Sequence, residues 1–319
     1  MSTAPDVRPA PGPPATAADE FPAYVRAPTG DLLAVVTEAT GEPLGLAAVL
    51  LRGAGWRPSS GPRRTQVTLA RRLAGHGLDA VRFSYHGLAE SGGAGEEVVR
   101  LDRPYTADAG AVVDWVADQG CRAVLIGNCF GARTALAYAA GPATGDRVAG
   151  LALVVPPVFD YEVARRLDRR PLGHFARRAR LGRLWAVLRD PARRRALRRT
   201  LRAFASVAGG KLRPGRGPAP ASTGGAPPEW LSPRFVAHLR AVVDRRIPVL
   251  FVYGRDDPYG ADFERARATA LGPLLAEAGG LVEVTVVPGR VHGLTSVETQ
   301  EAMIAAVEAW AASTFGRRA

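Results

Sequence analysis

Cys129 is the residue in this sequence whose surroundings most clearly indicate chemistry. It lies within Gly127 to Gly131, between a short apolar run at Arg122 to Ile126 and a strong helix-forming stretch at Ala132 to Ala140. A nucleophile on a sharp turn between a strand and a helix forms an elbow, here written Gly-x-Cys-x-Gly. Small neighbours are needed because the nucleophile has a strained backbone and bulk on either side would collide. The following helix N-terminus would stabilise a thiolate and an oxyanion. We therefore predict that Cys129 is a nucleophile and that Cys121 is a small buried residue.

A thiol nucleophile needs a base, and His292 has the most suitable position. It follows a late apolar run, Val282 to Val287, and comes last in the chain order that this kind of elbow requires. His86 also lies at the end of a predicted strand and could approach the site. The other histidines lie in a helix end or in or beside an insertion: His76, His174 and His238.

The base needs a carboxylate that fixes its tautomer and stabilises the imidazolium. The run at Ile247 to Tyr253 ends in two adjacent aspartates, Asp256 and Asp257. We predict Asp257 as the acid and keep Asp256 and Asp160 as alternatives, the last because it follows the preceding strand. An aspartate without this role would be a solvated turn residue.

The oxyanion donors are predicted to be backbone N–H groups. One belongs to Phe130, directly after the nucleophile, and the other to Ala54 in the loop Gly53 to Gly55. This chemistry needs no cofactor and no metal, and we expect neither.

Strand and helix patterns alternate along the chain around these residues. Such alternation with short connections predicts a mostly parallel sheet covered by helices on both faces, an α/β fold whose ligands bind beyond the carboxyl ends of the strands. The strands are expected at 31–40, 44–52, 78–85, 122–126, 150–155, 247–253 and 282–287, and the helices at 65–75, 105–120 with Thr106 as N-cap, 132–140 and 296–315.

The alternation is interrupted once, which defines the domain organisation. Residues 1–20 are rich in proline and are expected to form a disordered leader. Residues 21–159 and 246–319 form the predicted core, and residues 160–245 form an insertion that we expect to fold as a basic helical lid. The insertion carries apolar helical stripes and a Pro/Gly-rich tract at 214–228.

The basic charge of the chain is concentrated in this insertion. The chain has a net charge of +12, whereas Tyr161 to Arg216 alone holds 17 Arg and Lys211 against three acidic residues, a local +15. One interpretation is that its arginines dock an anionic partner, such as a phosphopantetheine-bearing acyl carrier protein or coenzyme A. The alternative is a solvated helix face. The candidate contacts lie on one predicted helix: Arg194, Arg195, Arg198 and Arg199.

Composition also limits the possible classes of protein. No apolar stretch is long enough for a transmembrane segment, and the first residues lack the pattern of an export signal. Two cysteines do not make a disulfide framework, so we expect a cytoplasmic protein. The sequence has no nucleic-acid-binding motif, so we expect no nucleic-acid partner.

Together these motifs resemble the α/β-hydrolase superfamily from about Val35 to Phe315, apart from the insertion. The supporting segments are LLRGAG at 50–55, RFSYHGLAES at 82–91, IGNCFGA at 126–132, VYGRDDP at 252–258 and GRVHG at 289–293. Within the superfamily, the elbow with cysteine is similar to hydrolases found near bacterial exosortase systems, and also to dienelactone hydrolases. Most members carry serine at the elbow and aspartate where this chain has Ser84, which affects substrate identity but not the fold.

The leading functional hypothesis is an acyl-transfer enzyme, either an ester or thioester hydrolase or an acyltransferase, that works through an acyl-enzyme. A first alternative is a lyase or another non-hydrolytic enzyme that uses the same triad, because a fold does not determine a reaction. A second alternative is a basic binding module for nucleic acid or an anionic membrane. The acyl group, the acceptor and the oligomeric state are not encoded in these motifs.

Overall fold

The computed structural model of the chain describes residues 18–53, 59–95, 99–160, 230–294 and 296–316. The chain divides into two compact units, Met1–Asp160 with Ala226–Ala319, and Tyr161–Gly225. The second unit lies outside the described residues, and with it the predicted lid helices and the four candidate carrier-binding arginines. Most of the predicted leader and Ala54 also lie outside them.

The first unit is built on an eight-stranded sheet in the order β1-β2-β4-β3-β5-β6-β7-β8. β1 and β2 are antiparallel to their neighbours, and every other pairing is parallel, which confirms the predicted mostly parallel sheet. The strands are β1 (Glu20–Val25), β2 (Leu32–Thr37), β3 (Leu46–Leu51), β4 (Asp79–Phe83), β5 (Arg122–Asn128), β6 (Val148–Val154), β7 (Val249–Gly254) and β8 (Val282–Val287).

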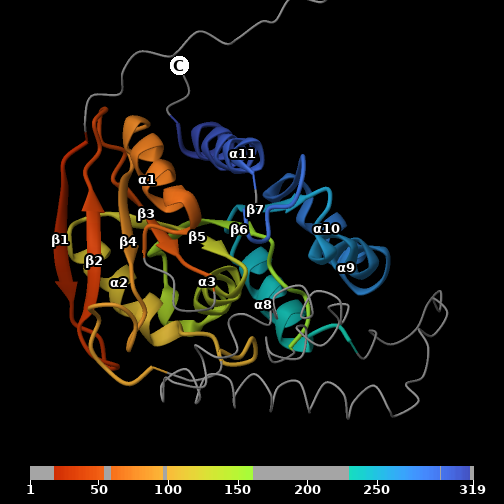
Figure 1. Cartoon of the computed structure of the whole chain (residues 1–319). Coiled ribbons are helices and arrows are strands. Elements are labelled where there is room, and N and C mark those ends of the chain that lie inside the picture. Colours follow the sequence, from red (N-terminus) through yellow and green to blue (C-terminus); the bar gives the residue numbers. More distant parts are fainter. Residues whose placement is uncertain (1–17, 54–58, 96–98, 161–229, 295, 317–319) are drawn as a thin grey trace, which may run out of the picture. The chain divides into compact units, whose positions relative to one another are not determined.

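Helices cover both faces of this sheet (Figure 1). α1 (Thr65–Gly75) and α11 (Val297–Phe315) pack together on one face, while α2 (Thr106–Asp118), α3 (Phe130–Ala140) and α8 (Pro233–Asp244) pack on the other. α9 (Pro258–Ala266) and α10 (Gly272–Ala278) are joined by the π-helical turn Arg267–Leu271, and short 3-10 turns lie at Pro62–Arg64, Pro142–Thr144 and Gly279–Leu281. Among the described residues, no helix has the length and apolar character needed to cross a membrane.

The burial of the strands explains their sequences. Every residue of β6 is buried, and β5 is buried from Ala123 to Gly127, because helices cover both faces and leave no polar side. The two edge strands differ from these central strands because they have exposed apolar side chains, namely Phe21 and Tyr24 on β1 and Val286 on β8. Pro22 suits β1 because an edge strand tolerates the loss of an N–H donor.

The structure differs from the sequence predictions at a few elements. β1, α8, α9 and α10 were not predicted. α2 begins after Tyr105 and has no side-chain cap, so the prediction of Thr106 as N-cap is wrong. Ser296 does cap α11, since its hydroxyl accepts from the Thr299 amide. α8, which the sequence grouped with the insertion, belongs to the same compact unit as the sheet, so the first unit resumes at Ala226 rather than at residue 246.

Candidate active site

Cys129 occupies a strained position between β5 and α3. Its φ of 51° and ψ of −107° lie where residues other than glycine rarely occur. The Cys129 amide donates to the Val154 carbonyl on β6 at 2.8 Å. The Cys129 carbonyl accepts from the backbone amide of Arg133 at 3.2 Å within the first turn of α3. The surrounding structure therefore fixes this conformation, which is the geometry of an elbow.

The two glycines of the motif are required by close packing. A Cβ on Gly127 would lie 2.5 Å from the Ala132 Cα, and a Cβ on Gly131 would lie 2.6 Å from the Leu51 carbonyl carbon. Real Cβ atoms essentially never approach this closely, so β5, α3 and β3 can meet only if both positions are glycine. This close approach is the physical reason for the Gly-x-Cys-x-Gly pattern.

The groups expected to bind an oxyanion lie around the same turn. Phe130 is the first residue of α3, where helix geometry leaves amide N–H groups without an intrahelical acceptor. Gly53, two residues after the end of β3, lies against the elbow, since a Cβ built on it would be 3.9 Å from the Cys129 Cβ. The predicted second donor, Ala54, lies outside the described residues.

Asp257 is buried and held by three backbone amides. Its Oδ1 accepts from His292 at 2.9 Å, and its Oδ2 accepts from Gly254 at 2.9 Å and from Val291 at 3.0 Å. Burial raises the pKa of this carboxyl group, and the three amides oppose the rise. The side chain therefore joins the end of β7 to the loop that carries His292. Asp256, in contrast, is exposed.

His292 is half-buried and contacts an aromatic side chain. The Tyr259 ring, at the start of α9, lies 4.7 Å from the imidazole between centroids, at an angle of 57°. Tyr259 in turn stacks on Phe159 at 5.8 Å and 13°. Neither aromatic residue was predicted, because nothing in their local sequence indicates a contact with the base.

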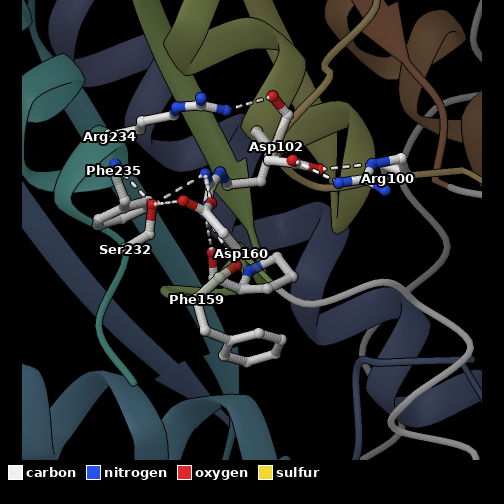
Figure 2. A network of polar contacts seen from close by, with 9 residues as sticks. Arg100, Asp102, Phe159, Asp160, Ser232, Arg234 and Phe235 are labelled. Atoms are coloured by element: carbon white, nitrogen blue, oxygen red, sulfur yellow. Dashed lines mark hydrogen bonds and ion pairs between the residues drawn. The ribbon is translucent and has the colours of Figure 1, made fainter. Parts of the chain in front are cut away.

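Asp160, the other alternative acid, is engaged elsewhere (Figure 2). Its Oδ1 accepts from the Arg133 guanidinium at 2.5 Å, and its Oδ2 accepts from the Ser232 hydroxyl at 2.5 Å. Both of its oxygens are therefore used in a network around Arg133, and no contact with His292 is among these bonds.

The remaining described histidines have separate environments. His86 bonds through Nδ1 to the buried Asp108 at 2.8 Å, and its ring lies 4.7 Å from Tyr105. His76 pairs with Glu308 at 2.8 Å and is exposed. Burial lowers the pKa of His238, with the positive charge of Arg133 as the next cause. Asp108 was another residue that sequence reasoning missed. Within the described ranges, no group of three or more His, Cys, Asp or Glu could hold a metal ion.

A mostly parallel sheet with helices on both faces and an elbow after a central strand defines a hydrolase of the α/β type. The sequence profile of the Alpha/beta hydrolase family matches residues 48–306, which is more than half of the chain, and the chain belongs to this family. It is an α/β-hydrolase enzyme by family. No curated protein sequence matches the chain significantly.

Solved structures support the fold. The esterase Pf2001 from Pyrococcus furiosus is 13% identical with a TM-score of 0.58, and the match covers 94% of each chain. A thermostable carboxyl esterase from Bacillus coagulans is 16% identical with a TM-score of 0.55, over 93% of this chain and 99% of that one. Est1E from Butyrivibrio proteoclasticus, solved with ferulic acid, is 17% identical with a TM-score of 0.55, over 92% and 100%. At these identities the likeness shows the fold alone.

Proposed function

We propose that the protein is an acyl-transfer enzyme that uses Cys129, His292 and Asp257 as its catalytic triad. The observation that carries the proposal is the elbow itself: Cys129 stands at a strained φ directly before α3, between two glycines that cannot be replaced. The buried Asp257, which follows β7 and accepts from the backbone amide of His292 on the loop after β8, supplies the acid. The esterase folds among the structural neighbours are consistent with this class of reaction.

In the proposed reaction the Cys129 Sγ attacks the carbonyl carbon of an ester or thioester. His292 accepts the thiol proton and returns it to the leaving oxygen or sulfur, while Asp257 stabilises the imidazolium. The Phe130 amide and an amide of the loop that begins at Gly53 donate to the oxyanion. Water or another acceptor then attacks the Cys129 thioester with His292 as general base, and the thiol is released.

A cysteine nucleophile favours particular substrates within this class. The intermediate is a thioester, which keeps the acyl group activated for transfer to an acceptor other than water. We therefore propose thioester substrates and acyl transfer ahead of plain ester hydrolysis. A non-hydrolytic reaction on the same triad would give an eliminated or rearranged product and no acyl-enzyme.

The basic segment supports a finer proposal about the substrate carrier. Its local charge of +15 would attract a phosphopantetheine-bearing protein or coenzyme A. Replacing Arg194, Arg195, Arg198 and Arg199 with Gln should raise the KM for a coenzyme A thioester and leave kcat almost unchanged. Added salt should mimic this change in the parent, because surface charges are screened over about 8 Å at physiological ionic strength. Kinetics that respond to neither treatment would mean that these arginines are a solvated face.

The central test is the mass of the intact protein after incubation with an activated acyl thioester. The parent and Cys121→Ala should gain one acyl group, whereas Cys129→Ala should gain none and should lose turnover while it keeps its fold. Loss of a nucleophile typically costs far more than tenfold in kcat. Activity within about tenfold of the parent in Cys129→Ala would therefore refute the assignment.

A further inference from the structure

Arg133 is a buried cation one turn beyond the nucleophile on α3. Its side chain is 3% exposed, and burial lowers its pKa. Arginine is seldom buried in this way without specific partners, because removal of its charge from water is costly. Its contacts therefore indicate what it does.

Within the described part of the chain, the hydrogen bonds of the Arg133 guanidinium lead to the segment after β6 and to Ser232, which caps α8. Nη1 donates to the Pro157 carbonyl at 3.0 Å and to the Phe159 carbonyl at 3.1 Å. Nη2 donates to Asp160 at 2.5 Å and to Ser232 at 3.3 Å. The guanidinium thus fixes the backbone on both sides of residue 158.

The segment held by Arg133 carries Phe159, whose ring packs against the aromatic residue beside the base. The buried Phe159 side chain stacks on Tyr259, and Tyr259 packs against the His292 imidazole. Tyr259 also lies two residues after Asp257, whose Oδ1 accepts from the His292 amide. His292 is therefore held at its backbone by Asp257 and at its ring by Tyr259.

From this chain of contacts we propose that Arg133 is a positioning residue for His292, acting through Phe159 and Tyr259. Arg133 is on α3, the helix that follows Cys129, so its hydrogen bonds connect this helix to the segment whose Phe159 ring stacks on Tyr259 beside the base. The network thereby sets the position of the imidazole relative to the Cys129 thiol. This inference rests on the proposed roles of Cys129 and His292.

The readout is the ultraviolet absorbance of the Cys129 thiolate as a function of pH, measured in a Cys121→Ala background so that one thiol contributes. A nearby imidazolium stabilises a thiolate, so the titration reports how well His292 is placed, independently of substrate. Turnover on an activated acyl thioester is measured alongside it, with kcat and KM separated.

The variants remove the network at both ends. Arg133→Met is combined with Asp160→Asn, because removing one partner alone leaves an uncompensated charge. Tyr259→Leu removes the ring, and Tyr259→Phe keeps it. Arg234→Met is the matched control, since Arg234 lies in the same neighbourhood but donates to the Asp102 carbonyl instead. Thermal unfolding checks each variant, and Phe159→Leu replaces the Arg133 variant if that one does not fold.

We expect the Arg133/Asp160 variant and Tyr259→Leu each to lower kcat by about 10- to 100-fold, since a misplacement of about 1 Å can cost roughly 100-fold. The thiolate titration should move upward by about one pH unit, which corresponds to a tenfold weaker stabilisation. Tyr259→Phe should recover most of the loss, and Arg234→Met should match the parent. Combined, the Arg133/Asp160 and Tyr259→Leu changes should lower kcat by much less than the product of their separate effects.

Two results would overturn the inference. The first is that the folded variants lose turnover while the pH titration of the Cys129 thiolate stays unchanged. The second is that the losses in kcat of the Arg133/Asp160 and Tyr259→Leu variants multiply when the changes are combined. His292→Ala separates this failure from a failure of the proposed function. If His292→Ala leaves the titration unchanged, the proposed base is wrong; if it shifts the titration and the network variants do not, only the role of Arg133 is wrong.

Discussion

Two histidine–aspartate pairs in the described part of the chain lie at different places in the fold. In the pair after β7 and β8, Asp257 accepts from the backbone amide of His292 at 2.9 Å. In the pair after β4, Asp108 accepts from the His86 amide at 2.8 Å and contacts the His86 Nδ1 at 2.8 Å. Both aspartates are buried. Burial of the carboxylate is thus a feature that the two pairs share.

The His86 pair joins three segments of the fold. Asp108 lies in the first turn of α2, His86 follows β4, and the Thr29 hydroxyl before β2 donates to the second Asp108 oxygen at 2.6 Å. The chain around them is closely packed, since a Cβ on Gly30 would lie 2.8 Å from the backbone of Gly92. We interpret this pair as a structural link, whereas we propose the pair that includes His292 for catalysis.

Replacing each histidine in turn is the most direct test of the difference between the two pairs. His292→Ala should lower kcat/KM by about 10³-fold or more, because the thiol loses its base. His86→Ala should lower it by less than about tenfold per folded molecule, because in our interpretation it takes no part in the reaction. Steady-state kinetics on one activated thioester measures both. Similar large losses would place His86 in the catalytic machinery, within reach of the elbow through Tyr105, whose ring contacts both His86 and Phe130.

The two adjacent aspartates should also differ in their effect on turnover. Asp257→Asn should lower turnover by about 10²- to 10⁴-fold, because an amide cannot stabilise the imidazolium and replaces one acceptor oxygen with a donor. Asp256→Asn, at an exposed neighbouring position, is the matched control and should be mild. The reverse ranking would move the role to Asp256. Small, equal effects would direct attention to Asp160 despite its bonds to Arg133.

The structural pair should instead dominate stability. Asp108→Ala removes the acceptor of three hydrogen-bonding groups in a buried place and should lower the free energy of unfolding by about 3 kcal/mol. Thr29→Val, which removes one donor, should cost about 1 kcal/mol. Denaturant unfolding measures both. If Asp108→Ala unfolds at the same denaturant concentration as the parent, the pair is not the link that we infer.

The smallest expected effect is on the pH dependence of stability. Because burial raises the pKa of Asp257, the folded state keeps its proton at pH values where the unfolded chain releases it. The stability that this group contributes is then full below its ordinary pKa and is lost as the pH rises through the folded value. Compared with Asp257→Asn, the parent should therefore lose stability over this acidic range. A difference of one unit between the folded and unfolded pKa changes the free energy of unfolding by about 1.4 kcal/mol. Urea unfolding at a series of pH values tests the sign, and a gain by the parent would mean that the three amides outweigh burial.

The sequence was most informative where a local steric rule applies. The bounds of α1 and β8 agree with the prediction to the residue, and the glycines around Cys129 indicated the elbow that the structure contains. These features depend on periodicity and on close backbone packing within a few residues. β1 escaped prediction because it is a short edge strand with Pro22 and exposed aromatics, a pattern that resembles a loop.

The side-chain partners could not be predicted, because they meet only after the chain has folded. Arg133 and Ser232 are 99 positions apart, and Thr29 and Asp108 are 79 apart. Neither contact has a local sequence pattern, and a lone arginine in an alanine-rich helix indicates only a helix. The choice of Asp257 over Asp256 remains a prediction, although burial distinguishes the two in a way that the sequence alone could not.

The bond between Asp160 and Ser232 has a consequence for how this chain can diverge. Their side chains meet across 72 positions of sequence, so this one contact joins two points of the sheet-containing unit that are far apart along the chain. The entropy of closing a flexible loop grows only logarithmically with its length, so a doubling adds about 0.6 kcal/mol. A lineage can therefore lengthen, shorten or exchange what lies between these two residues at little thermodynamic cost to the sheet. Selection can then act on the inserted sequence while the elbow stays as it is.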